Sequence, residues 1–187
     1  MEGGFFSGQL LIAMPGIGDP RFERAVILVC AHDAEHAMGL AVNRPVEGLT
    51  VPDLLERLEI ESVIRLPDDL VLMGGPVETQ RGFVLHTDDY GVEHSLRISG
   101  GVALTATRDA LEAMASPDEH PRRALLALGD AGWGAGQLEN EIKENVWLTC
   151  EADEGLIFGD DYESKWTRAL AKLGVDPQFL GSAAGRA

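Results

Sequence analysis

Short apolar runs separated by turn residues recur along the chain and predict β-strands. The first two runs flank the sequence Pro-Gly-Ile-Gly-Asp-Pro at positions 15–20, which is typical of a turn. Apolar runs bounded in this way are typical of buried strands. The predicted strands are residues 9–13, 25–30, 38–43, 70–73, 82–86, 96–99, 102–105, 146–150 and 156–158, and residues 124–129 are a further continuous apolar run.

Four segments place apolar residues on one face and predict helices. Leu138 and Ile142, for example, are four residues apart and share one side of a helix. Helix ends are marked by capping residues and by Gly or Pro. The predicted helices run from the N-cap Thr50 through Leu58, start near Thr107, follow the glycine-rich stretch 132–136, and extend from a cap at Asp160 or Asp161 to Gly174.

The order of these elements predicts one α+β domain covering residues 1–187. Strands come in runs instead of alternating strictly with helices, which is typical of α+β folds. The chain carries no linker, low-complexity tract or internal repeat that would divide it. The ends, about residues 1–6 and 180–187, are expected to be flexible.

Composition and charge narrow the classes of partner. Hydrophobic residues make up 45% of the 187 positions and charged residues 25%, which excludes a disordered chain and a collagen-like repeat. Acidic residues number 31 against 15 Lys and Arg, so the formal net charge is -16. An acidic surface repels nucleic acid and anionic lipid headgroups, so direct DNA binding is disfavoured.

Cysteine usage and the first residues predict a cytoplasmic protein. Cys30 and Cys150 each lie in an apolar run, which favours reduced, buried thiols over a disulfide. The chain starts with Glu2 where a secretory signal would have Lys or Arg, and its first basic residue is Arg21. No early apolar run approaches the length of a membrane span, so no membrane partner is expected.

Familiar catalytic and metal motifs are absent from the sequence. It contains no G-x-S-x-G elbow, no phosphate loop ending in Gly-Lys-Ser/Thr, and no H-E-x-x-H helix. His32 and His36, with Cys30 and Cys150, offer zinc-type donors, but their spacing does not fit a zinc finger. We therefore expect no metal and no cofactor.

The glycine-rich stretch 132–136 allows two interpretations. A loop before a helix exposes backbone N–H groups that attract anions. Glu139 and Glu141 would oppose an anion there, so we favour close packing around Trp133, with Gln137 at the start of the helix.

The few cations at strand ends and turns form a second candidate site. Arg21, Arg44 and Arg81 offer planar guanidinium groups suited to carboxylate or phosphate, and Asn43 and His86 could add neutral hydrogen bonds. The alternative is that each Arg pairs with one of the many acidic residues, which carries little energy or function.

Six sequence blocks occur in order along the chain. They are Gly-Gln-Leu-Leu-Ile-Ala-Met-Pro (8–15), Asp-Pro-x-Phe (19–22), Met-Gly-Leu-Ala-Val-Asn-Arg-Pro (38–45), Gly-Gly-Pro-Val (74–77), Arg-Gly-Phe-Val-Leu-His (81–86) and Gly-Trp-Gly-Ala-Gly-Gln-Leu-Glu-x-Glu-Ile (132–142). These blocks resemble the YqgE/AlgH family of bacterial proteins, and the resemblance covers roughly residues 5–187. The family usually has Gly where this chain has His36, and His where it has Arg186, so a role for that terminal His is in doubt here.

The resemblance implies a fold and only a general function. The family fold is an α+β domain around a curved, barrel-like sheet, mixed or antiparallel, which here would be flanked by about four helices. The family has no agreed enzymatic activity and no established catalytic residues. Its name is associated with transcriptional regulation of alginate synthesis.

Three functional hypotheses follow. The favoured one is a non-enzymatic regulatory or interaction module that binds a protein partner or a small acidic ligand. The alternatives are a regulator that acts directly on DNA, and an enzyme using His86 or His32 as acid or base with Asp19, Asp33 or Asp88. The candidate binding residues are Arg21, Asn43, Arg44, Gly74, Gly75, Arg81, His86, Trp133 and Gln137.

Overall fold

A computed structural model describes residues 6–16, 18–61, 69–90, 95–98, 101–106, 108–116 and 120–178. The ends expected to be flexible, 1–6 and 180–187, lie outside the described residues except for Phe6. The strands are β1 (Gln9–Ala13), β2 (Val26–His32), β3 (His36–Ala41), β4 (Pro45–Thr50), β5 (Leu70–Met73), β6 (Val77–Thr87), β7 (Leu96–Ile98), β8 (Val102–Thr105), β9 (Ala124–Gly134) and β10 (Trp147–Glu151). The helices are α1 (Val51–Arg57), α2 (Arg108–Met114), α3 (Gln137–Lys143), α4 (Glu154–Phe158) and α5 (Lys165–Lys172), with 3-10 turns at Pro20–Phe22 and Tyr162–Ser164.

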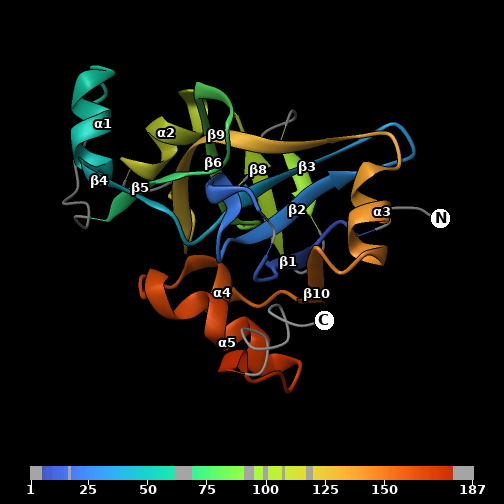
Figure 1. The fold of residues 1–187 in the computed structure, drawn as a ribbon. Helices are drawn as coiled ribbons and strands as arrows, with labels where there is room; N and C mark the ends of the chain where they lie inside the picture. The colour runs from blue at the N-terminus through green and yellow to red at the C-terminus, as the bar shows by residue number, and fades with distance from the viewer. Residues whose placement is uncertain are drawn as a thin grey trace.

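The strands form one curved, mixed sheet (Figure 1). Its main path runs β10-β1-β2-β3-β9-β6-β8-β7, with every neighbouring pair antiparallel. Strand β5 adds a parallel pairing to β9, and β4 pairs with β5. The sheet curls enough for Ile98 of β7 to share a core cluster with Leu28 of β2. The predicted α+β fold with a curved, barrel-like sheet is confirmed.

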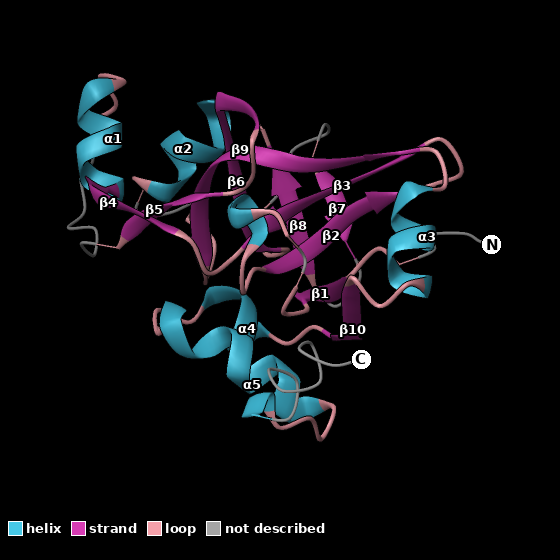
Figure 2. Ribbon diagram, viewed as in Figure 1, coloured by secondary structure: helices cyan, strands magenta, loops and turns pink. Residues whose placement is uncertain are grey.

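Alternate residues of β1 and β2 enter two different cores, because successive side chains of a strand point to opposite faces. Leu10 and Ile12 belong to a core that α4 and α5 cover with residues such as Trp166. Leu11 belongs to a second core that Leu138 of α3 closes from the other face. Figure 2 shows α3 apart from α4 and α5, and α1 and α2 at the far end of the sheet. Both faces are therefore covered, and both strands read as continuous apolar runs.

The first predicted helix begins where the sequence indicated. Thr50 accepts a hydrogen bond from the Asp53 backbone N–H at 3.2 Å, and the Asp53 carboxylate accepts one from the Thr50 N–H. This capping box satisfies two N–H groups that the first turn leaves without partners. The last helix likewise ends before Gly174, whose φ of 72° is the left-handed conformation that favours glycine.

Three sequence interpretations are wrong. Residues 156–158 lie in helix α4 and not in a strand, because Asp153 caps the Leu156 N–H at 2.8 Å. Residues 132–134 continue strand β9, since Trp133 is buried opposite Ala37 of β3, and only residues 135–136 turn into α3. Helix α5 starts at Lys165 after a 3-10 turn, and the Asp161 side chain makes no cap hydrogen bond. The structure also contains strand β4, which the apolar pattern does not predict. With α4, the described residues form five α-helices instead of the four predicted.

Candidate functional site

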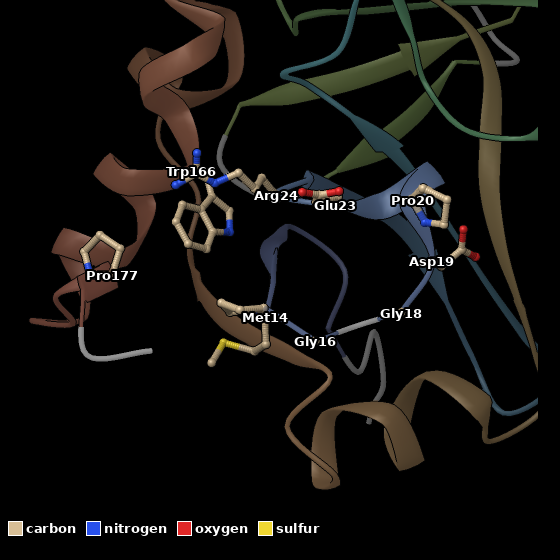
Figure 3. Close-up of a pocket in the computed structure, with 10 residues that line it drawn as sticks. Met14, Gly16, Gly18, Asp19, Pro20, Glu23, Arg24, Trp166 and Pro177 are labelled. Atoms are coloured by element: carbon tan, nitrogen blue, oxygen red, sulfur yellow. The ribbon is translucent and has the colours of Figure 1, made fainter. Parts of the chain in front are cut away.

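The loop between β1 and β2 and the helix α5 enclose an open cavity of about 490 Å³, here called the loop pocket (Figure 3). The two elements come from opposite ends of the chain and meet because Trp166 of α5 packs into the core under β1. The residues that line the loop pocket are Met14, Pro15, Gly16, Gly18, Asp19, Pro20, Glu23, Arg24, Trp166 and Pro177.

Asn43 and Arg44 hold the loop wall of this pocket in place. The Asn43 side chain accepts a hydrogen bond from the Val26 N–H at 2.9 Å and donates one to the Arg24 carbonyl at 2.9 Å. The Arg44 guanidinium donates to the carbonyls of Glu23 at 2.8 Å and Pro20 at 3.2 Å. Two adjacent side chains after β3 thus hold three carbonyls of the described loop, those of Pro20, Glu23 and Arg24, so this part of the wall is held in place by the protein itself.

Arg24 is the cation among the described residues that line the loop pocket. Its guanidinium carbon lies 4.4 Å from the centre of the Trp166 ring, a cation–π contact that holds the group over the indole. Trp166 is itself fixed, because its indole N–H donates to the Ala13 carbonyl at 2.8 Å. The backbone of Arg24 has φ 56°, an unfavourable conformation for a residue with a side chain. Such strain persists only where surrounding contacts impose it, and here Asn43 does so.

Some charged side chains along the wall form ion pairs and others do not. Arg21 donates to both carboxylate oxygens of Asp19, and these hydrogen bonds lower the pKa of the Asp19 carboxyl. Glu23 and Arg24 are both exposed and adjacent, yet neither forms an ion pair with any residue in the described part of the chain. The pocket therefore offers one unpaired carboxylate and one unpaired guanidinium.

A buried lysine lies directly before Trp166. The Lys165 ammonium has no solvent exposure and donates to the carbonyls of Val42 and Ile157, each at 2.9 Å. Burial lowers the pKa of Lys165 to about 7, and the positive charges of Arg168 and Arg123 act in the same direction. These bonds join the start of α5 to the end of β3 and to α4, and so place Trp166 beside the loop.

The structure separates the other sequence candidates from this pocket. Gly74 and Gly75 pack against the backbone of β9, where a side chain at either position would collide with Gly129 or Asp130. The Arg81 guanidinium lies 5.1 Å from the ring centre of Phe83. Of the candidate binding residues named from the sequence, only Arg21, Asn43 and Arg44 support the loop pocket, and Asp19, named in the enzyme hypothesis, lines it.

His86 and His32 are both used inside the fold. His86 is fully buried, and its Nδ1 and Nε2 lie 2.8 Å from the Thr87 carbonyl and the Thr105 hydroxyl. Burial lowers the pKa of His86, which favours a neutral ring that donates from Nδ1 and accepts at Nε2. His32 accepts from the Phe6 N–H at 3.2 Å, and its Nε2 lies 3.2 Å from Glu139. Neither imidazole lines the loop pocket.

Trp133 and Gln137 form a separate structural cluster. The Glu141 carboxylate accepts hydrogen bonds from the indole N–H groups of Trp133 at 3.0 Å and Trp147 at 2.9 Å. Gln137 donates to the same carboxylate at 2.9 Å and accepts from the Gly134 N–H at 2.9 Å. These contacts join α3 to β9 and β10, which agrees with close packing around Trp133.

Among the described residues there is neither a cluster of metal-ligand side chains nor a membrane-spanning helix. In the part of the chain that the structure describes, no group of three or more His, Cys, Asp or Glu side chains is arranged to hold a metal ion. Both cysteines are buried and free, as predicted. None of the described helices combines the length and the apolar character needed to span a bilayer.

The sequence analysis named neither Arg24 nor Trp166 as a functional residue, although Trp166 lies within the last predicted helix. The only local signal was that Arg24 directly precedes a strand within an acidic chain. The contact between Arg24 and Trp166 joins distant parts of the chain, which no local pattern can predict.

Comparison with known proteins gives a consistent result. A family model described as AlgH-like matches residues 10–178. The chain is 65% identical over 187 residues to a UPF0301 protein of Caulobacter vibrioides, covering 100% of this chain and 96% of that protein. It is 54% identical over 194 residues to a UPF0301 protein of Bradyrhizobium sp. (strain BTAi1), covering 100% and 89%.

Solved structures show the same fold. The solution structure of the AlgH protein from Pseudomonas aeruginosa matches with a TM-score of 0.76 and 37% identity, covering 100% of both chains. A crystal structure of a Corynebacterium diphtheriae protein matches with a TM-score of 0.76 at 19% identity, covering 96% of this chain and 92% of that one, which supports the fold alone. The ordered motif blocks, the family model and the close relatives agree, and the chain belongs to the AlgH-like family.

Proposed function

We propose that this protein is a non-enzymatic regulatory or interaction module that binds a small ligand in the loop pocket. The observation that carries the proposal is the construction of its wall. Asn43 and Arg44 fix the loop, and Trp166 fixes Arg24, so the recognition groups are ordered before a ligand arrives. A wall ordered in advance reduces the entropy lost on binding.

The residue types along the wall favour binding over catalysis. The described lining contains no His, Cys or Ser, so its groups that could act as a base or a nucleophile are the carboxylates of Asp19, which is paired with Arg21, and of Glu23. The two histidines of the enzyme hypothesis make hydrogen bonds or ion pairs elsewhere in the fold. The loop pocket combines an apolar floor with a few charged groups, which is typical of a small-molecule site.

Direct DNA binding receives no support from the charges. The chain carries a net charge of -16, and several of its cations already face carboxylates. Arg21 pairs with Asp19, Arg122 with Glu154 and Lys172 with Asp153, each at 2.8 or 2.9 Å. Cations engaged in this way are less available to phosphates.

The test uses the tryptophan indole N–H signals in a ¹H–¹⁵N NMR spectrum. The probe is the protein-free, small-molecule extract of bacterial cells. We expect it to shift the Trp166 indole and the Gly16 and Gly18 amides, and to leave Trp133 and Trp147 unchanged, because the latter two lie in the Glu141 cluster. An extract that shifts no signal of the loop pocket contradicts the proposal.

The matched variants are Asn43→Asp and Asn145→Asp. Aspartate at position 43 still accepts from Val26 but cannot donate to the Arg24 carbonyl, so the loop wall is released. We expect this variant to lose about 1–3 kcal/mol of unfolding free energy and most of the Trp166 response. Asn145→Asp makes the same chemical change at an exposed site outside the pocket and should respond like the wild type.

A further inference from the structure

We propose that the loop pocket takes a small zwitterion of the amino-acid class, with the ligand carboxylate on Arg24 and the ligand ammonium on Glu23. This inference rests on the proposed function and adds the chemical class of the ligand. Its basis is a pair of opposite charges that line one cavity and do not bind each other.

Glu23 and Arg24 are adjacent in the chain but do not form an ion pair with each other. Here the guanidinium is instead held over Trp166, 4.4 Å from its ring centre, and no described residue pairs with Glu23. Figure 3 shows Arg24 extended toward Trp166 with Glu23 beside it at the same edge of the cavity. Both charges remain available to a ligand.

Arg24 is suited to a carboxylate. The guanidinium presents a planar fork of N–H donors that matches the two oxygens of a carboxylate. Contact with the Trp166 ring shields one side of the group and limits its rotamers, while Asn43 fixes its backbone. A fork held in this way loses less freedom when a carboxylate binds.

Glu23 is the carboxylate left for an ammonium group. Asp19, the other acidic residue of the wall, is already paired with Arg21, whose guanidinium makes three hydrogen bonds to its carboxylate. The Glu23 backbone is held at its carbonyl by Arg44 at 2.8 Å, so its side chain starts from a fixed point. A ligand carrying only negative charge, such as a phosphate ester, would meet Glu23 as a repulsive neighbour.

The remaining wall is apolar and has room for a side chain. Figure 3 places Met14 across the cavity from Glu23 and Arg24, with Pro177 beyond Trp166 and Pro20 beside Asp19. A cavity of about 490 Å³ is in the range of small-ligand sites. The arrangement fits a ligand with two charged groups at one end and an apolar group at the other.

The experiment compares three probes that differ in one charge at a time. L-Phenylalanine carries both charges, N-acetyl-L-phenylalanine only the carboxylate, and L-phenylalaninamide only the ammonium. Each is titrated against the protein with the Trp166 indole N–H signal as readout. We expect phenylalanine to bind about tenfold more tightly than either analogue, since each removes one charge-assisted contact.

Crossed variants assign each charge to its residue. Arg24→Gln should bind phenylalanine and phenylalaninamide equally, because the carboxylate no longer contributes. Glu23→Gln should bind phenylalanine and N-acetyl-L-phenylalanine equally. The matched controls are Glu56→Gln and Arg57→Gln, an adjacent Glu-Arg pair on α1 outside the pocket, which should keep the wild-type order.

The outcomes separate this inference from the proposed function. Equal binding of the three probes to the wild type, or no loss of discrimination in the crossed variants, overturns the zwitterion assignment. A response of Trp166 to the cell extract but to none of the three probes also overturns it, and leaves the proposed function standing.

Discussion

At the scale of single residues, Lys165 shows how the fold accommodates a buried titratable amine. The amine has no solvent exposure, and it makes its hydrogen bonds to two backbone carbonyls instead of to a carboxylate. The Tyr162 ring centre lies 5.3 Å from the Lys165 nitrogen, and Arg168, Arg123 and Asp160 supply the nearby charges. Neutral Lys still has two N–H donors, which is enough for both carbonyls.

We expect the unfolding free energy to rise with pH between 7 and 9. The pKa of Lys165 is about 7 in the folded protein and near its ordinary value of 10.5 in the unfolded chain. Over this range the unfolded state binds the proton more tightly, so raising the pH favours the folded state, by up to about 2 kcal/mol.

Urea unfolding at pH 7, 8 and 9 measures this dependence, with Lys165→Met as the control that removes the titrating group. The series stops at pH 9 because burial raises the pKa of Cys30 to about 12, from an ordinary 9.0, and thiol ionisation then favours unfolding. A wild-type slope no steeper than that of Lys165→Met contradicts the prediction.

At the scale of elements, one carboxylate joins a helix to two strands. Glu141 of α3 accepts from Trp133 of β9 and Trp147 of β10, and the two rings pack edge to face at 6.0 Å. The apolar spacing of Leu138 and Ile142 predicted the helix but gave no sign of a packing role for Glu141. Its function in packing depends on two strands that are brought together by the sheet.

We expect Glu141→Leu to cost about 2–4 kcal/mol of unfolding free energy. Leucine leaves both indole N–H groups without an acceptor, and each buried donor that loses its partner costs about 1–3 kcal/mol. Glu141→Gln keeps one acceptor oxygen and should cost less than half as much. Glu144→Leu, an exposed position next to the end of α3, is the matched control. Urea unfolding followed by tryptophan fluorescence gives all three values, and equal losses for Leu and Gln would refute this account.

At the scale of the whole molecule, the sheet depends on close backbone contact between β9 and the segment that follows β5. Gly75 lies against the backbone of Asp130 and Ala131, and Gly129 has φ 75° at the same crossing. A side chain at position 75 would have to displace backbone and not a flexible side chain. The Gly-Gly-Pro segment that follows β5 is thus a packing contact at the centre of the sheet.

We expect Gly75→Ala to destabilise the protein by about 4 kcal/mol or more, because a methyl group there collides with the backbone of β9. Gly82→Ala is the control, since the nearest atom to a methyl group at that position is a Leu128 side-chain carbon at 3.9 Å. Thermal unfolding followed by circular dichroism distinguishes them. Similar melting temperatures for the two variants would contradict the prediction, because they would show that the backbones at Gly75 and Asp130 can move apart at little cost.

Local sequence patterns predicted most strands, the capping box at Thr50 and the family, because apolar runs, caps and motif blocks act within a few residues. Residues 156–158 show the limit of this approach. Three apolar residues fit a strand or a helix turn equally, and the cap at Asp153 decides between them.

The site depended on contacts between distant segments. The sequence analysis named Asn43 and Arg44 as candidate ligand-binding residues. In the structure their side chains instead hold the loop that carries Glu23 and Arg24. Arg24 meets Trp166 only because the sheet and α5 bring the two ends of the chain together. Hydrogen bonds and ring contacts of this kind depend on three-dimensional proximity, which periodicity along a chain does not encode.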